Sequence, residues 1–100
     1  MNMQQMMAQA QKMQRELRKA QAELDAKEFT VTKGGAVTVV MKGSLELVSV
    51  DIDSDAFNPD DKEMVQDMIV MAINEIMEQI EDARGDINER ITGQRSGVGF

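Results

Sequence analysis

The stretch that decides the fold is Phe29–Asp53, FTVTKGGAVTVVMKGSLELVSVDID. It is rich in β-branched residues and is interrupted at two places, Gly34–Gly35 and Gly43–Ser44. Such pairs favour two-residue hairpin turns, whose central residues have positive φ angles. The pattern therefore predicts a three-stranded antiparallel sheet over residues 29–53, with strands at 29–32, 36–42 and 45–53.

Apolar side chains occur on both faces of the predicted sheet. In the middle strand Val37, Val39 and Met41 alternate with Thr38 and Val40. One covering helix would bury only one face, and the outer strands of a three-stranded sheet have edges that proteins usually pair or cover. We therefore expect a homodimer in which the sheets of two copies join.

The segment before the sheet, residues 3–27, predicts one long helix. It lacks glycine, proline and β-branched residues and consists largely of strong helix formers. Its apolar residues are spaced alternately by three and four, which is typical of a helix that packs against another helix. This apolar seam comprises Met3, Met6, Ala10, Met13, Leu17, Ala20 and Leu24. Such a helix is about 37 Å long, so we expect part of it to project as an arm or to pair with another subunit.

Residues 59–92 predict a second long helix. Asn58 suits the N-cap position and Pro59 the first helical turn. Apolar residues then recur at helical spacing from Val65 to Ile91, in a stripe wide enough to cover a sheet. Gly85 is a candidate for a kink or an early end, but Gly93 is the more favourable stop. Residues 93–100 are expected to form a flexible tail, so that residues 1–100 make a single α+β domain.

The residue types that are missing exclude most familiar catalytic sites. The chain has no cysteine and no histidine, and hence no thiol nucleophile, disulfide or common zinc ligand. Alternating aspartates at residues 51–55 resemble part of a calcium loop, but Ala56 and Lys62 occupy the places of its essential Gly and Glu. We interpret these aspartates as a solvated strand end and a helix cap. We expect no enzyme activity, cofactor, metal or small-molecule substrate.

The hydropathy pattern predicts neither a membrane span nor a signal peptide. No apolar run approaches the ~18 residues that cross a bilayer, and the start MNMQQMMAQAQK lacks a basic segment followed by an apolar core. We therefore expect a cytoplasmic protein without a membrane partner.

Charge is distributed unevenly along the chain. The net charge is -7, yet residues 1–27 contain five cationic and three anionic side chains. Four of these cations fall on the helix face opposite the seam, where they could contact phosphates. The alternative is an ordinary solvated face of an amphipathic helix. The candidate DNA-binding residues are Lys12, Arg15, Arg18 and Lys19, with Arg84 and Arg90 of the second helix as secondary contacts.

Several short motifs follow one another in a distinctive order. They are MMAQAQKMQ at 6–14, GGAVTV at 34–39, KG at 42–43, VDID at 50–53, DDKEM at 60–64 and AIN at 72–74. Together they resemble the YbaB/EbfC family of small bacterial nucleoid-associated DNA-binding proteins. The resemblance implies a homodimer with joined sheets and projecting helical arms that bind double-stranded DNA with little sequence specificity. It also implies a location at the nucleoid and a role in nucleoid organisation or gene expression.

A second hypothesis is a non-enzymatic adaptor. The Met-rich first helix would then dock into a groove of a protein partner, with Met3, Met6, Met7 and Met13 as adaptable anchors. The two hypotheses use different faces of one helix, since DNA requires the cationic face and a protein partner requires the seam.

Overall fold

The computed structural model describes residues 2–94 and contains a helix, three strands and a second helix in that order. The predicted α+β fold is therefore confirmed. The tail predicted at 93–100 lies mostly outside the described residues. The helices are α1 (Met3–Ala26) and α2 (Lys62–Thr92), the strands are β1 (Glu28–Lys33), β2 (Val37–Lys42) and β3 (Leu47–Ile52), and two 3₁₀ turns, η1 (Ser54–Ala56) and η2 (Pro59–Asp61), precede α2.

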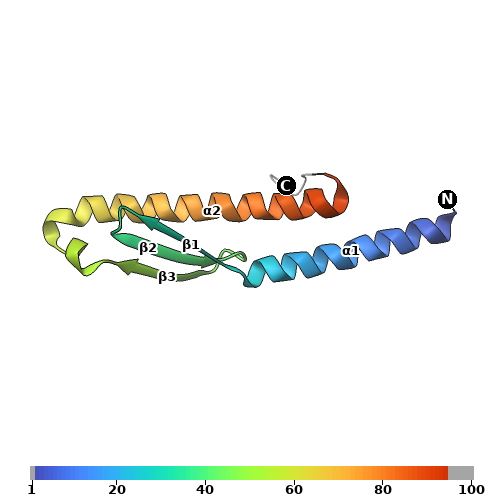
Figure 1. Cartoon of the computed structure of the whole chain (residues 1–100), viewed down its shortest axis with the longest axis horizontal. Helices are drawn as coiled ribbons and strands as arrows, with labels where there is room; N and C mark the ends of the chain where they lie inside the picture. The colour runs from blue at the N-terminus through green and yellow to red at the C-terminus, as the bar shows by residue number, and fades with distance from the viewer. Residues whose placement is uncertain (1, 95–100) are drawn as a thin grey trace.

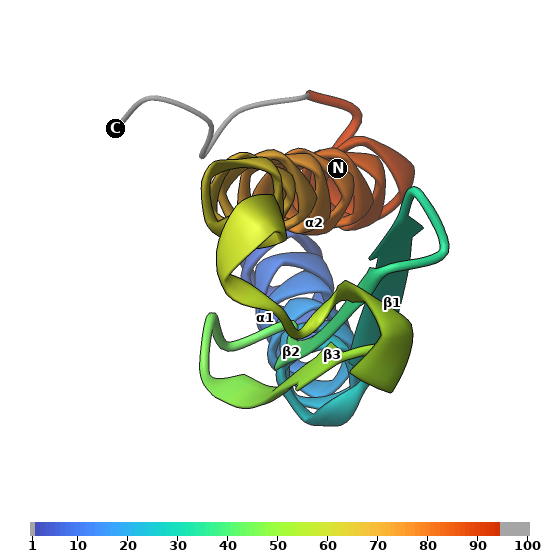
Figure 2. The same ribbon diagram turned by 90° about the vertical axis from the view of Figure 1, so that its left-hand side faces the viewer.

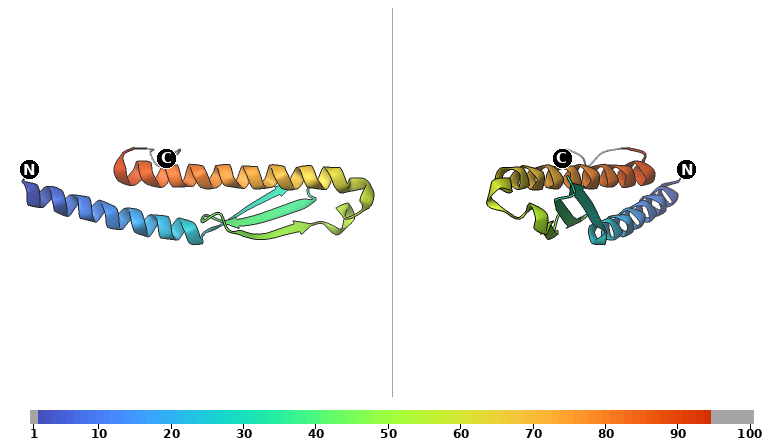
Figure 3. Two further views of the ribbon diagram at one scale, coloured as in Figure 1. Left: turned by 180° about the vertical axis from the view of Figure 1, so that it is seen from behind. Right: turned by 60° about the vertical axis from the view of Figure 1, so that its left-hand side comes forward.

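The molecule is elongated, with extents of 69 × 20 × 17 Å. α2 lies along one face of the sheet and continues past the end of the sheet (Figure 1). α1 leaves the sheet at that same end, runs beside the later part of α2, and extends beyond it (Figures 1 and 3). The N-terminal part of α1 therefore projects, which was one of the two arrangements expected for this helix.

The sheet has the order β1-β2-β3 with both pairs antiparallel, so β2 is the central strand. α2 covers one face of the sheet, as the view along the long axis shows (Figure 2). Val37, Val39 and Met41 of β2 are buried and belong to one hydrophobic cluster with residues of α2. They pack against apolar residues of α2 that recur at helical spacing, among them Ala72, Ile76 and Ile80. The hydrophobic core consists of Val31, Ala36, Val37, Val39, Met41, Ala56, Val65, Ala72, Ile76 and Ile80.

The first hairpin turn has the predicted backbone conformation. Gly34 and Gly35 have φ angles of 58° and 64°, and the Ala36 N–H donates to the Lys33 carbonyl at 2.9 Å. Glycine adopts this left-handed conformation without the steric cost that a Cβ atom would add.

The prediction for the second turn is wrong. The positive φ angle, 73°, belongs to Leu45 and not to Gly43 or Ser44. The strand after the turn consequently begins at Leu47. Gly43 has a different role, because a Cβ atom on it would lie 2.0 Å from the Leu24 carbonyl oxygen of α1. The glycine is required by the close approach of α1, which hairpin rules cannot predict.

The second helix ends at the predicted residue, but α2 begins at Lys62, three residues after the predicted start, because Pro59–Asp61 form a 3₁₀ turn. The Asn58 side chain accepts a hydrogen bond from the Asp60 N–H at 3.0 Å, and Pro59 opens the 3₁₀ turn that leads into α2. At the other end Gly93, with φ 78°, caps the helix and donates to the Glu89 carbonyl at 2.9 Å. Gly85 is buried within the helix and does not end it.

Candidate nucleic-acid interface

The four cations of α1 are all exposed. Lys12, Arg15, Arg18 and Lys19 lie on the face of the helix opposite its seam, whereas the seam residues Ala20 and Leu24 are buried. Because side chains three and four residues apart share a helix face, the four cations form one continuous cationic stripe. We call Lys12, Arg15, Arg18 and Lys19 the cationic face.

The seam is covered over only part of its length. Ala20 and Leu24 are buried and Leu17 is half-buried, where α1 runs beside α2. Met6, Ala10 and Met13 are exposed, because they belong to the part of α1 that extends beyond α2 (Figure 3). We call this projecting part, residues 3–13, the arm tip.

Backbone hydrogen bonds attach the C-terminal end of α1 to the β2–β3 turn. The Gly43 N–H donates to the Lys27 carbonyl at 2.9 Å, and the Ser44 N–H donates to the Asp25 carbonyl at 3.3 Å. The absence of a side chain at Gly43 allows these two backbones to meet. The direction in which the arm projects is thus set where α1 joins the sheet.

Arg84 ties α2 to the same junction. Its Nη2 atom lies 2.8 Å from Asp25 Oδ1 and donates to the Gly43 carbonyl at 3.0 Å. Both side chains are partly exposed, so the ion pair alone contributes modestly to stability. The hydrogen bond to the Gly43 carbonyl helps to fix the orientation of the Arg84 side chain. The structure therefore places Arg84, a candidate DNA contact in the sequence, in a clamp that holds the base of the arm.

Arg90 lies close to the cationic face. It is exposed and shares a shallow groove between α1 and α2 with Lys19, Ala20 and Ile91. Glu16 and Glu23 line the same groove, so anionic side chains border the cationic face here. The structure thus brings Arg90 and Lys19 to one groove, whereas Arg84 is bound to Asp25 and the Gly43 carbonyl.

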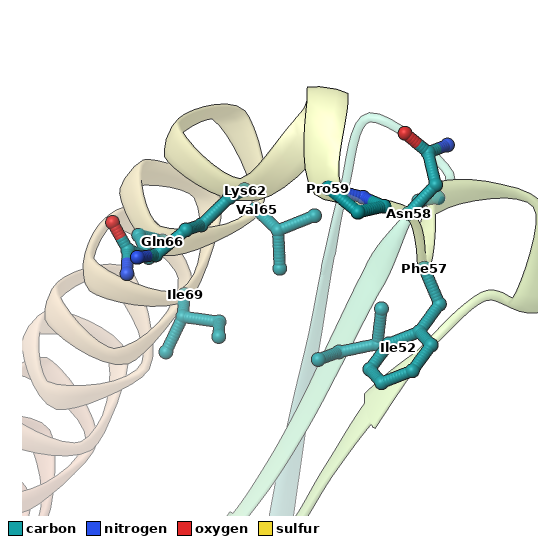
Figure 4. A pocket seen from close by; sticks show the side chains of 9 residues that line it. Ile52, Phe57, Asn58, Pro59, Lys62, Val65, Gln66 and Ile69 are labelled. Atoms are coloured by element: carbon teal, nitrogen blue, oxygen red, sulfur yellow. The ribbon is translucent and has the colours of Figure 1, made fainter.

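A cavity of about 420 Å³ lies at the other end of the molecule, between β3 and the start of α2. Its lining is mainly apolar and includes Ile52, Val65 and Ile69, and the Phe57 ring lies beside Ile52 (Figure 4). Phe57 is 78% exposed. Exposed apolar surface of this kind is typical of interaction sites.

Residues 2–94 contain no group of three or more aspartate or glutamate side chains placed to bind a metal ion. Within this same part of the chain, no helix has both the length and the apolar character needed to span a bilayer.

The fold and the exposed cationic face define an α+β protein with a projecting, basic helical arm. The sequence matches the model of the YbaB/EbfC DNA-binding family over residues 1–95, and the chain belongs to this family. A nucleoid-associated protein of Clostridium novyi is 42% identical over 94 residues, covering 93% of this chain and 82% of the relative. One from Streptococcus agalactiae is 40% identical, covering 94% of this chain and 96% of the relative.

A solved structure shares the fold. The crystal structure of an uncharacterized protein from Helicobacter pylori superposes with a TM-score of 0.76 at 26% sequence identity. The match covers 93% of this chain and 99% of the other. The resemblance to the YbaB/EbfC family, identified from short motifs, is confirmed.

Proposed function

We propose that this protein is a nucleoid-associated homodimer that binds double-stranded DNA through its helical arms. Lys12, Arg15, Arg18 and Lys19 contact phosphates, and Arg90 extends the same surface. Binding is weak and largely independent of DNA sequence, and it takes place at the nucleoid in the cytoplasm. The observation that carries the proposal is the exposed cationic face on a projecting helix, in a chain that belongs to a DNA-binding family.

The separation of charge favours the arm as the contact surface. Residues 28–100 contain six cationic and fifteen anionic side chains, so most of the molecule repels a polyanion. Three of the six cations in residues 28–100, Lys33, Lys42 and Arg84, are paired with Glu75, Glu46 and Asp25. Lys12, at one end of the cationic face, belongs to the part of α1 that extends beyond the rest of the molecule (Figure 1). Phosphates can therefore approach this end of the cationic face at a distance from most of the carboxylates.

The composition of the arm favours non-specific recognition. The helix has no aromatic residue for base stacking, and the cations of its outer face are suited to phosphates, which carry no sequence information. Phe29 and Phe57, the aromatic residues within the described part of the chain, lie outside α1. Base-edge discrimination should therefore be slight.

The salt dependence of duplex binding tests this function. Four cations on each of two arms allow at most about eight phosphate contacts, for which log K against log [salt] has a slope of about -7. Acidic residues reduce the number that engage, and three or four contacts give a slope of about -3. We expect a slope between these limits, measured by fluorescence anisotropy with a labelled random duplex. A scrambled duplex of equal length should compete equally, whereas a slope near zero would contradict phosphate binding.

The homodimer is supported by apolar surface along one edge of the sheet. β3 is an edge strand, and Leu47, Val48 and Val50 on it are exposed. Val70 and Met77 of α2 are exposed as well. The cavity beside Ile52 and Phe57 opens at the end of this edge. A second copy that pairs with β3 would extend the sheet, cover this surface and place two arms in one particle.

A lysine at the β3 edge should separate the two protomers. Val48 is 45% exposed, so we expect Val48→Lys to leave the monomer folded while two like charges meet at the two-fold interface. Like-charge contact at an interface costs several kcal/mol, so the dissociation constant of the dimer should rise by about 100-fold. Sedimentation equilibrium measures the change. Thr30→Lys, which places the same charge on exposed β1 at the opposite edge, is the control and should remain dimeric.

A further inference from the structure

The apolar residues of the arm tip are exposed in the part of the chain that the structure describes. Met3, Met6 and Met13 are 76%, 57% and 36% exposed. They continue the seam whose later residues, Ala20 and Leu24, are buried where α1 meets α2. A seam with this spacing is suited to pack against another helix, and α2 does not cover the seam along the arm tip.

The spacing within the arm tip reads the same in both directions. Met3, Met6, Ala10 and Met13 are separated by three, four and three residues. When two arm tips are placed antiparallel, Met3 of one faces Met13 of the other, and Met6 faces Ala10. Each large side chain in the middle then meets a small one, as close helix packing requires.

Charge also favours a second arm tip as the covering helix. Residues 2–11 contain no charged side chain and consist only of Met, Gln, Ala and Asn. Residues 2–11 of two arm tips can therefore approach each other without repulsion between charged side chains. Lys12 and Arg15 point away from the seam, so they stay available to DNA when the seams pair.

We propose that arm tips of two dimers pair antiparallel through Met3, Met6, Ala10 and Met13. The pairing links neighbouring dimers on DNA while the cationic faces remain on the phosphates. Its biological use rests on the proposed function, but the contact itself does not require DNA. The shared seam of about 11 residues is only ~16 Å long. The contact is therefore weak in solution and forms when DNA holds the arms at high local concentration.

Cysteine cross-linking tests the contact directly, because the natural chain has no cysteine. Met6→Cys and Ala10→Cys chains, one of them carrying a size tag, are mixed with duplex DNA and treated with a short bis-maleimide. The expected main product links one Met6→Cys chain to one Ala10→Cys chain. Gln5→Cys mixed with Gln11→Cys is the control, because these positions have the same register on the outward face and should give at least tenfold less product.

The native mass of the cross-linked fraction shows which arms have paired. Light scattering should give twice the mass of the untreated protein, since two particles are joined. An unchanged mass would mean that the two arms of one dimer pair with each other, and it would overturn the proposal. Equal yields from the inward and outward cysteine pairs would overturn it too. If the untreated protein is a monomer, the homodimer is wrong, whereas a doubled mass after cross-linking still supports arm pairing.

Cooperativity of DNA binding provides a second readout. Met6→Gln with Met13→Gln should lower the Hill coefficient on a long duplex towards one, while affinity for a duplex that holds one dimer changes less than twofold. Met71→Gln is the control, because Met71 of α2 is 54% exposed and lies outside the arm. An unchanged Hill coefficient in the double variant, or non-cooperative binding by the natural protein, would contradict a link between dimers.

Discussion

Reversing two charges on the arm, with Arg15→Glu and Lys19→Glu together, should weaken duplex binding by on the order of 10²- to 10³-fold at 0.1 M salt. Each phosphate contact raises the affinity about tenfold when the salt concentration falls from 1 M to 0.1 M. The two substitutions remove up to four such contacts from a dimer. Both residues are exposed and lie opposite the seam, so the fold does not depend on them. Anisotropy with a labelled random duplex measures the loss, and the salt slope should fall in magnitude by about 2 to 4.

The matched control reverses two cations outside the cationic face and outside the cavity at the proposed dimer surface. Lys27→Glu with Lys42→Glu changes the net charge by the same amount, so general repulsion of DNA is equal in the two variants. Circular dichroism and light scattering should show that both variants keep the helix content and mass of the natural protein. If the two variants lose affinity equally, the arm is not the contact surface. The acidic chain would then be better explained as a protein-binding adaptor.

Gly43→Ala should destabilise the fold more than any exposed substitution. The added Cβ would lie 2.0 Å from the Leu24 carbonyl oxygen and 2.8 Å from its carbonyl carbon. Backbone atoms cannot move aside as a flexible side chain does, so the end of α1 must shift and its hydrogen bonds to the turn weaken. Overpacking of this kind costs about 2–4 kcal/mol. The thermal midpoint should fall by about 10 °C or more.

A comparison with Gly35→Ala distinguishes the loss of stability caused by steric overlap from the loss caused by backbone strain. Gly35 has a φ of 64° but open space around its Cβ position. Alanine there adds only the cost of a left-handed conformation, about 1–2 kcal/mol. A smaller loss of stability at Gly35 than at Gly43, measured by urea denaturation, supports the close approach of α1. Equal losses would show that the Gly43 contact relaxes freely.

The elements with strong local signals were predictable from the sequence. α1 has no helix breaker between Met3 and Ala26, and Asn58–Pro59 and Gly93 mark the limits of the second helical region. The Gly34–Gly35 turn follows the same logic, because positive φ angles are a local property. Local rules failed at the second turn, where Leu45 takes the left-handed conformation. The reason is tertiary, since Gly43 is required by a helix that begins some forty residues earlier.

The candidate site was likewise only partly predictable from the sequence. Helical periodicity alone predicted that Lys12, Arg15, Arg18 and Lys19 share a face. The pairing of Arg84 with Asp25 joins residues far apart in the chain, and no spacing rule indicates such a partner. Likewise, the heptad pattern does not show where cover by α2 stops and the arm tip begins. That limit depends on how far α2 extends past the sheet.

Because the molecule is elongated, its cationic and acidic parts are separated along its long axis. The cationic stripe lies on α1, which forms one end of a molecule that is 69 Å long and only 20 Å wide, and fifteen of the eighteen carboxylate side chains follow residue 27, in the part of the chain that reaches the other end (Figure 1). This separation of charge gives the molecule an electric dipole along its long axis. In the field of a duplex the dipole exerts a torque that turns the arm towards the DNA before contact. Even a protein with net charge -7 can therefore reach a polyanion in a productive orientation, and at low ionic strength collisions should be biased towards arm-first encounters.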